Sequence, residues 1–140
     1  MCDKTTDKER KCYAAIDIGS NAVRLLIKKE DEDENLVSRR LAKALLLRVP
    51  LRLDVFALGE LSEKKAKKLR RLMKAFRQLM KIYEVTDYRA CATSAMRDAR
   101  NGKSVISRIL KDSGINIEII NGQEEARIIY NNHIECLEDR

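Results

Sequence analysis

Aromatic residues, glycine and proline are all scarce in this chain of 140 residues. It contains no Trp, 2 Phe, 4 Tyr and 5 Gly, and its single proline is Pro50. Scarcity of Gly and Pro leaves long stretches without residues that interrupt helices or strands, so we expect extensive regular structure. The length suits one domain, or part of a larger one, with a core of its own.

Long apolar runs and metal-binding patterns are also missing. No apolar run approaches the roughly 20 residues of a membrane-spanning helix, and the N-terminal MCDKTTDKERK lacks the apolar core of a signal peptide. We therefore expect a cytoplasmic protein without membrane contact, in which residues 1–11 form a disordered lead-in. His133 is the single histidine and no CxxC spacing occurs, which argues against zinc. We expect the four cysteines to be reduced and structural: Cys2, Cys12, Cys91 and Cys136.

Positive charge predominates, with a formal net charge of +7. Much of it lies in one segment, on Lys64, Lys65, Lys67, Lys68, Arg70, Arg71, Lys74, Arg77 and Lys81. A basic balance favours polyanionic partners without identifying one. Because no aromatic or glycine pattern interrupts these cations, a solvated helix face is favoured over a nucleic-acid surface.

Hydrophobic periodicity predicts the order of the elements. A helix over about 63–83, with Ser62 as its N-cap, follows from apolar residues spaced by three and four. Gly114 suits the end of a helix over about 103–112. Strands are expected near 12–18, 22–29, 36–47, 88–92 and 115–120, and a final helix near 122–130. Three strands in hairpin order followed by alternating helix and strand predict a mixed α/β sheet.

The segment AAIDIGSNAVRLLI, residues 14–27, is the most informative part of the chain. An apolar strand ends in Asp17-Ile18-Gly19-Ser20-Asn21 and a second apolar strand follows at once. Small residues at such a hairpin tip offer backbone N–H groups to an anion, and Asp17 beside them suits a hydrated metal ion. An ordinary tight turn is the alternative.

Two later junctions carry polar side chains where a strand leads into a helix. In CATSAMR, Thr93 and Ser94 offer hydroxyl donors and Arg97 offers a forked cation that suits phosphate. Simple helix capping is the alternative for Thr93 and Ser94. In GQEEAR, Glu124 and Glu125 would stabilise the first turn of a helix, or one of them could accept a proton from an attacking water.

The three segments, in this order and spacing, resemble the N-terminal half of the Ppx/GppA family of exopolyphosphatases and guanosine pentaphosphate phosphohydrolases. The resemblance covers about residues 14–130. It implies a ribonuclease-H-like fold of the actin and sugar-kinase superfamily, a mixed sheet with flanking helices, of which residues 12–140 would be the first half of the N-terminal domain. It also implies magnesium as cofactor. A homodimer is expected because a chain that ends within its sheet should expose apolar surface and associate.

Site roles follow from the resemblance for matching residues. Asp17 would lie near the metal, and Gly19, Ser20 and Asn21 would form the first phosphate loop. Thr93, Ser94 and Arg97 would line the phosphate site, while Glu125 matches the proposed catalytic base and Glu124 would be structural. Two departures are visible: Ala22 stands where the family usually has Ser or Thr, and no second glycine-rich phosphate loop precedes Arg140.

The expected activity of the complete protein is hydrolysis of a terminal phosphoanhydride, releasing orthophosphate from inorganic polyphosphate or guanosine pentaphosphate. The 140-residue chain alone, truncated before the second loop, is expected to be inactive. The alternative is a non-catalytic homologue that binds a phosphate-containing ligand or a partner subunit. A nucleic-acid-binding domain is a third, less favoured reading, because only the net positive charge supports it.

Overall fold

The computed structural model describes residues 11–30, 41–53, 55 and 59–121. Five strands form one sheet in the order β3-β2-β1-β4-β5. β1 pairs antiparallel with β2 and β2 with β3, whereas β1–β4 and β4–β5 are parallel. The elements are β1 (Cys12–Ile18), β2 (Val23–Glu30), β3 (Leu41–Val49), α3 (Glu63–Ile82), β4 (Asp87–Ala92), α4 (Ser94–Asp98), α5 (Gly102–Ser113) and β5 (Ile117–Ile119).

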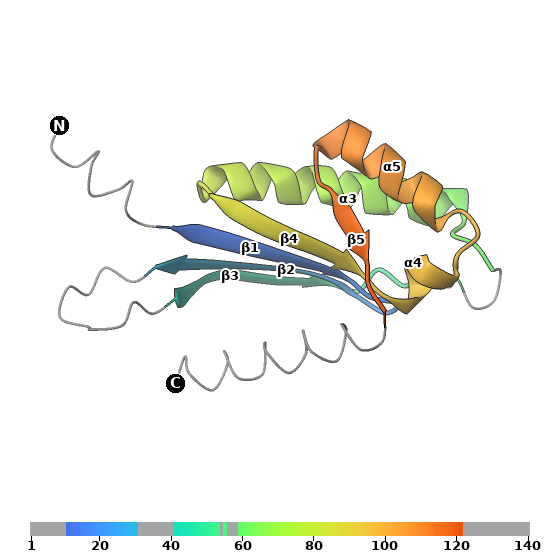
Figure 1. Ribbon diagram of the computed structural model, residues 1–140, viewed down its shortest axis with the longest axis horizontal. Coiled ribbons are helices and arrows are strands. Elements are labelled where there is room, and N and C mark those ends of the chain that lie inside the picture. The colour runs from blue at the N-terminus through green and yellow to red at the C-terminus, as the bar shows by residue number, and fades with distance from the viewer. Residues whose placement is uncertain (1–10, 31–40, 54, 56–58, 122–140) are drawn as a thin grey trace, which may run out of the picture.

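The mixed sheet predicted from the sequence is confirmed, with α3 and α5 on the same face of it (Figure 1). Alternation along β1 explains this arrangement, since Ile16 and Ile18 are buried in the core while Asp17 between them is half-buried on the other face. No helix within the described ranges is long and apolar enough to cross a membrane.

Helix α3 covers the sheet through one apolar stripe, as its periodicity predicted. Ser62 caps its first turn, because its Oγ accepts a hydrogen bond from the Lys65 backbone N–H at 3.2 Å. The inward side chains are fully or almost fully buried: Ala66, Leu69, Met73, Phe76 and Met80. The polar residues of the helix are thereby directed away from the sheet.

The second long helix, α5, ends as expected and begins in a way that the sequence did not indicate. Gly114 follows it with a φ of 77°, the left-handed conformation that glycine adopts at low cost. At its start, Gly102 lies so close to Met96 that a Cβ there would overlap the Met96 carbonyl oxygen. Glycine at this position therefore permits the close approach of α4 and α5.

Some predicted boundaries differ from the structure. β3 extends to Val49, two residues beyond the expected end, because it stays paired with β2 as far as Val23. The five-residue helix α4 was not predicted as a separate element, being too short for a periodic signal. Residues 1–10, the strand residues expected at 36–40 and the helix expected at 122–130 lie outside the described residues.

Candidate functional site

The predicted phosphate-binding segments meet at one edge of the sheet. β1, β4 and β5 run parallel, and Ile18, Ala92 and Ile119 lie in register at their carboxyl ends. The segments that follow these strands therefore leave the sheet side by side (Figure 1). In open α/β sheets this carboxyl edge is the usual place for a ligand.

Thr93 joins the first two segments through the main chain. Its backbone N–H donates to the Ile18 carbonyl oxygen at 3.1 Å, and its Oγ1 donates to the same oxygen at 3.4 Å. Thr93 is only 5% exposed, and its side chain does not cap α4. Both donors of Thr93 are thus directed at β1, so in this structure Thr93 positions the segment that carries Ser94.

Ser20 and Ser94 bring the two turns into direct contact. Their hydroxyl oxygens are 3.2 Å apart, and either can be the donor. Only one hydroxyl hydrogen is used in such a pair, so the other is left to donate to a ligand at this edge. Both side chains are half-buried, and the pair therefore offers a hydrogen-bond donor whose position is fixed from two strands.

Arg97 connects the second segment with the third. Its Nη1 donates to the Ile120 carbonyl oxygen at 2.8 Å, while the Ile120 N–H donates to the Ala92 carbonyl oxygen at 3.0 Å. A guanidinium has five N–H donors, so one such bond leaves most of them available to an anion. Arg97 is exposed, which makes it accessible from solvent.

The turn between β1 and β2 is fixed by more hydrogen bonds than the sequence suggested. The Gly19 N–H donates to the Ala22 carbonyl oxygen at 3.0 Å, and the Ser20 carbonyl oxygen accepts from the Leu53 N–H at 3.1 Å. The Gly19 N–H is therefore used within the turn and is not among the donors available to an anion. Asn21 is exposed at the tip.

The donor set at this edge fits magnesium in one respect. Asp17 lies in β1 opposite Arg24 and Cys91, half-buried and one residue before the strand ends. Nowhere in the described part of the chain do three His, Cys, Asp or Glu side chains gather into a metal-binding group. Magnesium is often held by one or two carboxylates together with water and substrate phosphates, and Asp17 fits that mode as a single ligand.

The predicted catalytic residue Glu125 and its neighbour Glu124 lie outside the described residues. Ile120, which follows β5 and precedes Glu125 by five residues in the sequence, is bonded both to Arg97 and to Ala92. The roles assigned to Asp17, Gly19, Ser20, Asn21, Thr93, Ser94, Arg97 and Glu125 stay predictions, and the first seven lie at or beside one edge of the sheet.

Sequence reasoning missed the part played by main-chain carbonyl groups. The oxygens of Ile18 and Ile120 fix Thr93 and Arg97, although neither isoleucine side chain is polar. The parallel pairing of β1 with β4 is the signal that could have found the Ile18 contact, because it places Thr93 beside a residue 75 positions earlier. The parallel pairing of β4 with β5 is the corresponding signal for the contact of Arg97 with Ile120.

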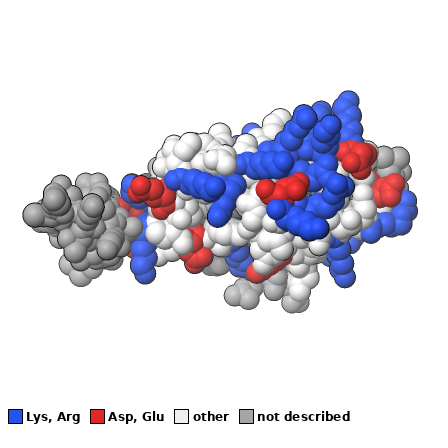
Figure 2. All heavy atoms as spheres, turned by 90° about the horizontal axis from the view of Figure 1, so that it is seen from above, with Lys and Arg blue, Asp and Glu red and all other residues white. Residues whose placement is uncertain are grey.

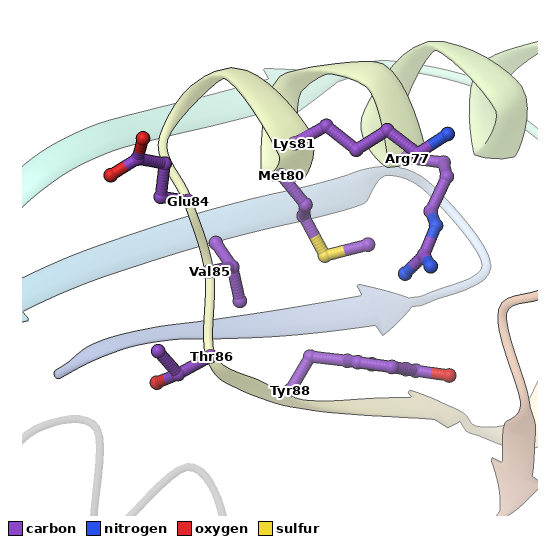
Figure 3. Close-up of a pocket in the computed structure, with 7 residues that line it drawn as sticks. All are labelled: Arg77, Met80, Lys81, Glu84, Val85, Thr86 and Tyr88. Carbon is purple, nitrogen blue, oxygen red and sulfur yellow. The ribbon is translucent and has the colours of Figure 1, made fainter. Parts of the chain in front are cut away.

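A separate pocket lies at the opposite edge of the sheet (Figure 3). Its volume is about 260 Å³, and it lies beside the start of β4, whereas the Thr93 turn follows the end of that strand. It is lined by Arg77, Met80, Lys81, Glu84, Val85, Thr86 and Tyr88. None of the residues predicted for the phosphate site borders this pocket.

Comparisons with known proteins find relatives of this chain among bacterial phosphatases. The chain is 30% identical over 115 residues to exopolyphosphatase 1 of Mycobacterium bovis, covering 82% of this chain and 33% of that protein. It is 32% identical over 130 residues to a bifunctional 3-dehydroquinate synthase/phosphatase of Fusobacterium nucleatum, covering 89% of this chain and 20% of that protein.

Solved structures that resemble this chain include a Ppx/GppA family member and an exopolyphosphatase. The crystal structure of the Aquifex aeolicus Ppx/GppA family member matches with a TM-score of 0.76 at 28% identity, over 84% of this chain and 37% of that one. An exopolyphosphatase from Cytophaga hutchinsonii matches with a TM-score of 0.74 at 27% identity, over 84% and 36%. The chain thus spans about a third of the length of these structures and of the mycobacterial relative. The sequence model of the family matches residues 44–140, and the chain belongs to the Ppx/GppA phosphatase family.

Proposed function

We propose that the protein containing this chain hydrolyses the terminal phosphoanhydride of inorganic polyphosphate and releases orthophosphate. The observation that carries the proposal is the Ser20–Ser94 contact of 3.2 Å, which joins two separate turns into one site beside Arg97. We choose polyphosphate rather than guanosine pentaphosphate as the substrate because two of the similar proteins are named exopolyphosphatases.

The chain's own residues would bind and orient the terminal phosphate. The hydroxyl hydrogen left over by the Ser20–Ser94 pair donates to one phosphate oxygen. The Arg97 guanidinium, held by the Ile120 carbonyl oxygen, contributes charge-assisted bonds to others. Such preorganised donors stabilise negative charge that develops on the phosphoryl group during transfer.

Glu125 is the proposed general base. A water molecule attacks the terminal phosphorus as Glu125 takes its proton, and the bond from phosphorus to the bridging oxygen breaks. Orthophosphate leaves, and the shortened chain keeps the bonding electrons on its new terminal oxygen. Magnesium, when held by Asp17 and the substrate, would neutralise part of the phosphate charge.

Replacement of the base tests the proposal. In the protein at its full natural length, Glu125→Gln is expected to lower phosphate release from polyphosphate by roughly 10²- to 10⁴-fold, because the amide cannot accept the proton. Polyphosphate binding, measured by fluorescence anisotropy, should stay nearly unchanged. Phosphate release is followed with malachite green.

Glu60→Gln is the matched control. Glu60 is exposed and its contact with Arg100 is a surface ion pair at 3.8 Å, so its loss should leave turnover as in the wild type. Unchanged turnover in Glu125→Gln would remove Glu125 as the base. A wild-type protein that binds polyphosphate and hydrolyses neither polyphosphate nor guanosine pentaphosphate would replace hydrolysis with anion binding as the function.

A further inference from the structure

The outer face of α3 carries more positive charge than any other described element. Nine of its residues are Lys or Arg, and Glu63 in the first turn is its one acidic residue. None of these nine cations forms an ion pair with another residue of the described ranges. Helix stability alone does not account for such a face, because like charges spaced by three and four repel one another.

Five of the six exposed cations of this helix follow one another at spacings of three, four, three and seven residues, and we call these five the α3 stripe: Lys64, Lys67, Arg71, Lys74 and Lys81. The first four lie on the side of the helix away from the buried residues that pack on the sheet, and Lys81 lies at the margin of that side. From Lys64 to Lys81 the stripe is about 26 Å long at 1.5 Å per residue. Figure 2 views the face that carries the long helices and shows Lys and Arg gathered over them, with few acidic side chains between.

The stripe runs from the site edge of the sheet to the opposite edge. Near its start, the Leu61 N–H donates to the Asn101 side chain at 2.9 Å, and Leu53 bonds to Ser20 in the first turn. Beyond its end, the Thr86 N–H donates to the carbonyl oxygen of Cys12, the first residue of β1. A long ligand held at the carboxyl edge could therefore continue along α3.

At its far end the stripe reaches the pocket of about 260 Å³. Arg77 and Lys81 line it from α3, and Figure 3 shows the Glu84 carboxylate directed to the other side, away from both cations. The Tyr88 hydroxyl donates to the Gly114 carbonyl oxygen at 3.3 Å and accepts from the Asn116 N–H at 3.0 Å, which fixes the ring as a wall. The pocket thus adds one further cation, Arg77, beside Lys81 at the end of the stripe.

We propose that the α3 stripe, together with Arg77, binds the body of an extended inorganic polyphosphate chain whose terminus occupies the carboxyl edge. The inference rests on the proposed function, which supplies the anchored terminus. A chain of phosphates is preferred to a nucleic acid because Phe76, the one aromatic residue of α3, is 1% exposed, so the stripe offers no base-stacking platform. Charge complementarity then acts on the phosphates alone, and affinity increases with chain length.

The test removes two charges from the centre of the stripe. Arg71→Gln/Lys74→Gln keeps good helix formers at both positions, and far-UV circular dichroism checks the fold. Binding of labelled long-chain polyphosphate is measured by anisotropy over a range of salt concentrations, with tripolyphosphate as the short ligand. Long-chain affinity is expected to fall roughly tenfold at low salt, and the salt slope by about 1.4, which is about 0.7 for each cation removed. Tripolyphosphate affinity should not change.

Lys11→Gln/Lys29→Gln is the matched control, because it removes the same charge from two exposed residues at β1 and β2. Equal losses in both double variants would reduce the effect to net charge and overturn the proposal, as would an equal loss for tripolyphosphate. Tighter binding of single-stranded DNA of the same charge would assign the stripe to nucleic acid instead. Binding is read without turnover, so failure of Glu125 as base would leave this result standing.

Discussion

At both ends of the parallel strands β1 and β4, hydroxyl side chains form hydrogen bonds between the neighbouring segments. The two ends differ in what these bonds leave available to a ligand. At the start of β1, Thr86 Oγ1 donates to the Cys12 carbonyl oxygen at 2.9 Å and accepts from the Cys12 N–H at 3.3 Å. At its end, Ser20 and Ser94 are bonded to each other at 3.2 Å. The Thr86 hydrogen is spent on the main chain, whereas the serine pair keeps one hydrogen to donate. The edge suited to ligands is thus the one whose hydrogen-bonding capacity is not exhausted by the fold.

Replacing Thr86 should lower stability more than replacing either serine of the Ser20–Ser94 pair. Thr86→Val keeps the shape of the side chain and the backbone bond to Cys12 but loses both side-chain bonds, so we expect the free energy of unfolding to fall by about 1–2 kcal/mol. Turnover of tripolyphosphate should stay as in the wild type, because Thr86 lies at the far edge and the Ser20–Ser94 pair lies at the site edge. Urea denaturation followed by circular dichroism measures the first effect, and a strong loss of turnover in a folded Thr86→Val protein would erase the contrast between the edges.

Replacing Ser94 should have the opposite effects, with a small loss of stability and a large loss of turnover. Ser94→Ala removes one hydroxyl from a half-buried pair, so unfolding free energy is expected to fall by less than about 1 kcal/mol. The site loses the donor that the pair directs at the ligand, and turnover should fall roughly tenfold, equivalent to about 1.4 kcal/mol of transition-state stabilisation. Ser20→Ala is the companion variant. If both serines act as one unit, the double variant should lose little more turnover than either single variant.

The sequence predicted elements that have a periodic apolar pattern of their own, and it did not predict the contacts between segments that are distant in sequence. Helix α3 was placed to within a residue, and β1 at its actual bounds, because each has a complete apolar period over its length. The meeting of Gly19–Asn21 with Thr93–Arg97 was implied by the resemblance to the Ppx/GppA family, and the structure shows it in the Ser20–Ser94 contact. The role of Thr93 did not follow, since its hydroxyl bonds to Ile18, 75 residues earlier, rather than capping α4.

Gly102 shows why local signals fail at such points. Its sequence neighbourhood gives no reason for glycine, because the constraint comes from the Met96 carbonyl oxygen on the preceding helix. The short α4 and the end of β3 escaped prediction for the same reason, being fixed by contacts with other elements rather than by their own periodicity.

The smallest expected effect concerns Cys12 at the far edge and depends on pH. Burial raises the pKa of the Cys12 thiol above its ordinary value of 9.0, an effect that Lys29 opposes and Glu84 reinforces. The unfolded thiol ionises at lower pH than the folded one, so the stabilising contribution is complete below pH 9 and is lost as pH rises through the raised pKa. Cys12→Ala should therefore flatten the alkaline limb of the stability curve, measured as Tm between about pH 8 and about pH 10.5, where lysine titration begins.

Chemical modification of Cys12 gives an independent measure of how firmly the far edge is closed. The thiol is buried and its pKa is raised, so Cys12 in the folded wild type should react slowly with iodoacetamide at about pH 8, as peptide mass spectrometry would show. Rapid alkylation at Cys12, or an unchanged alkaline limb in Cys12→Ala, would mean that the far edge opens more readily than its two Thr86 bonds imply.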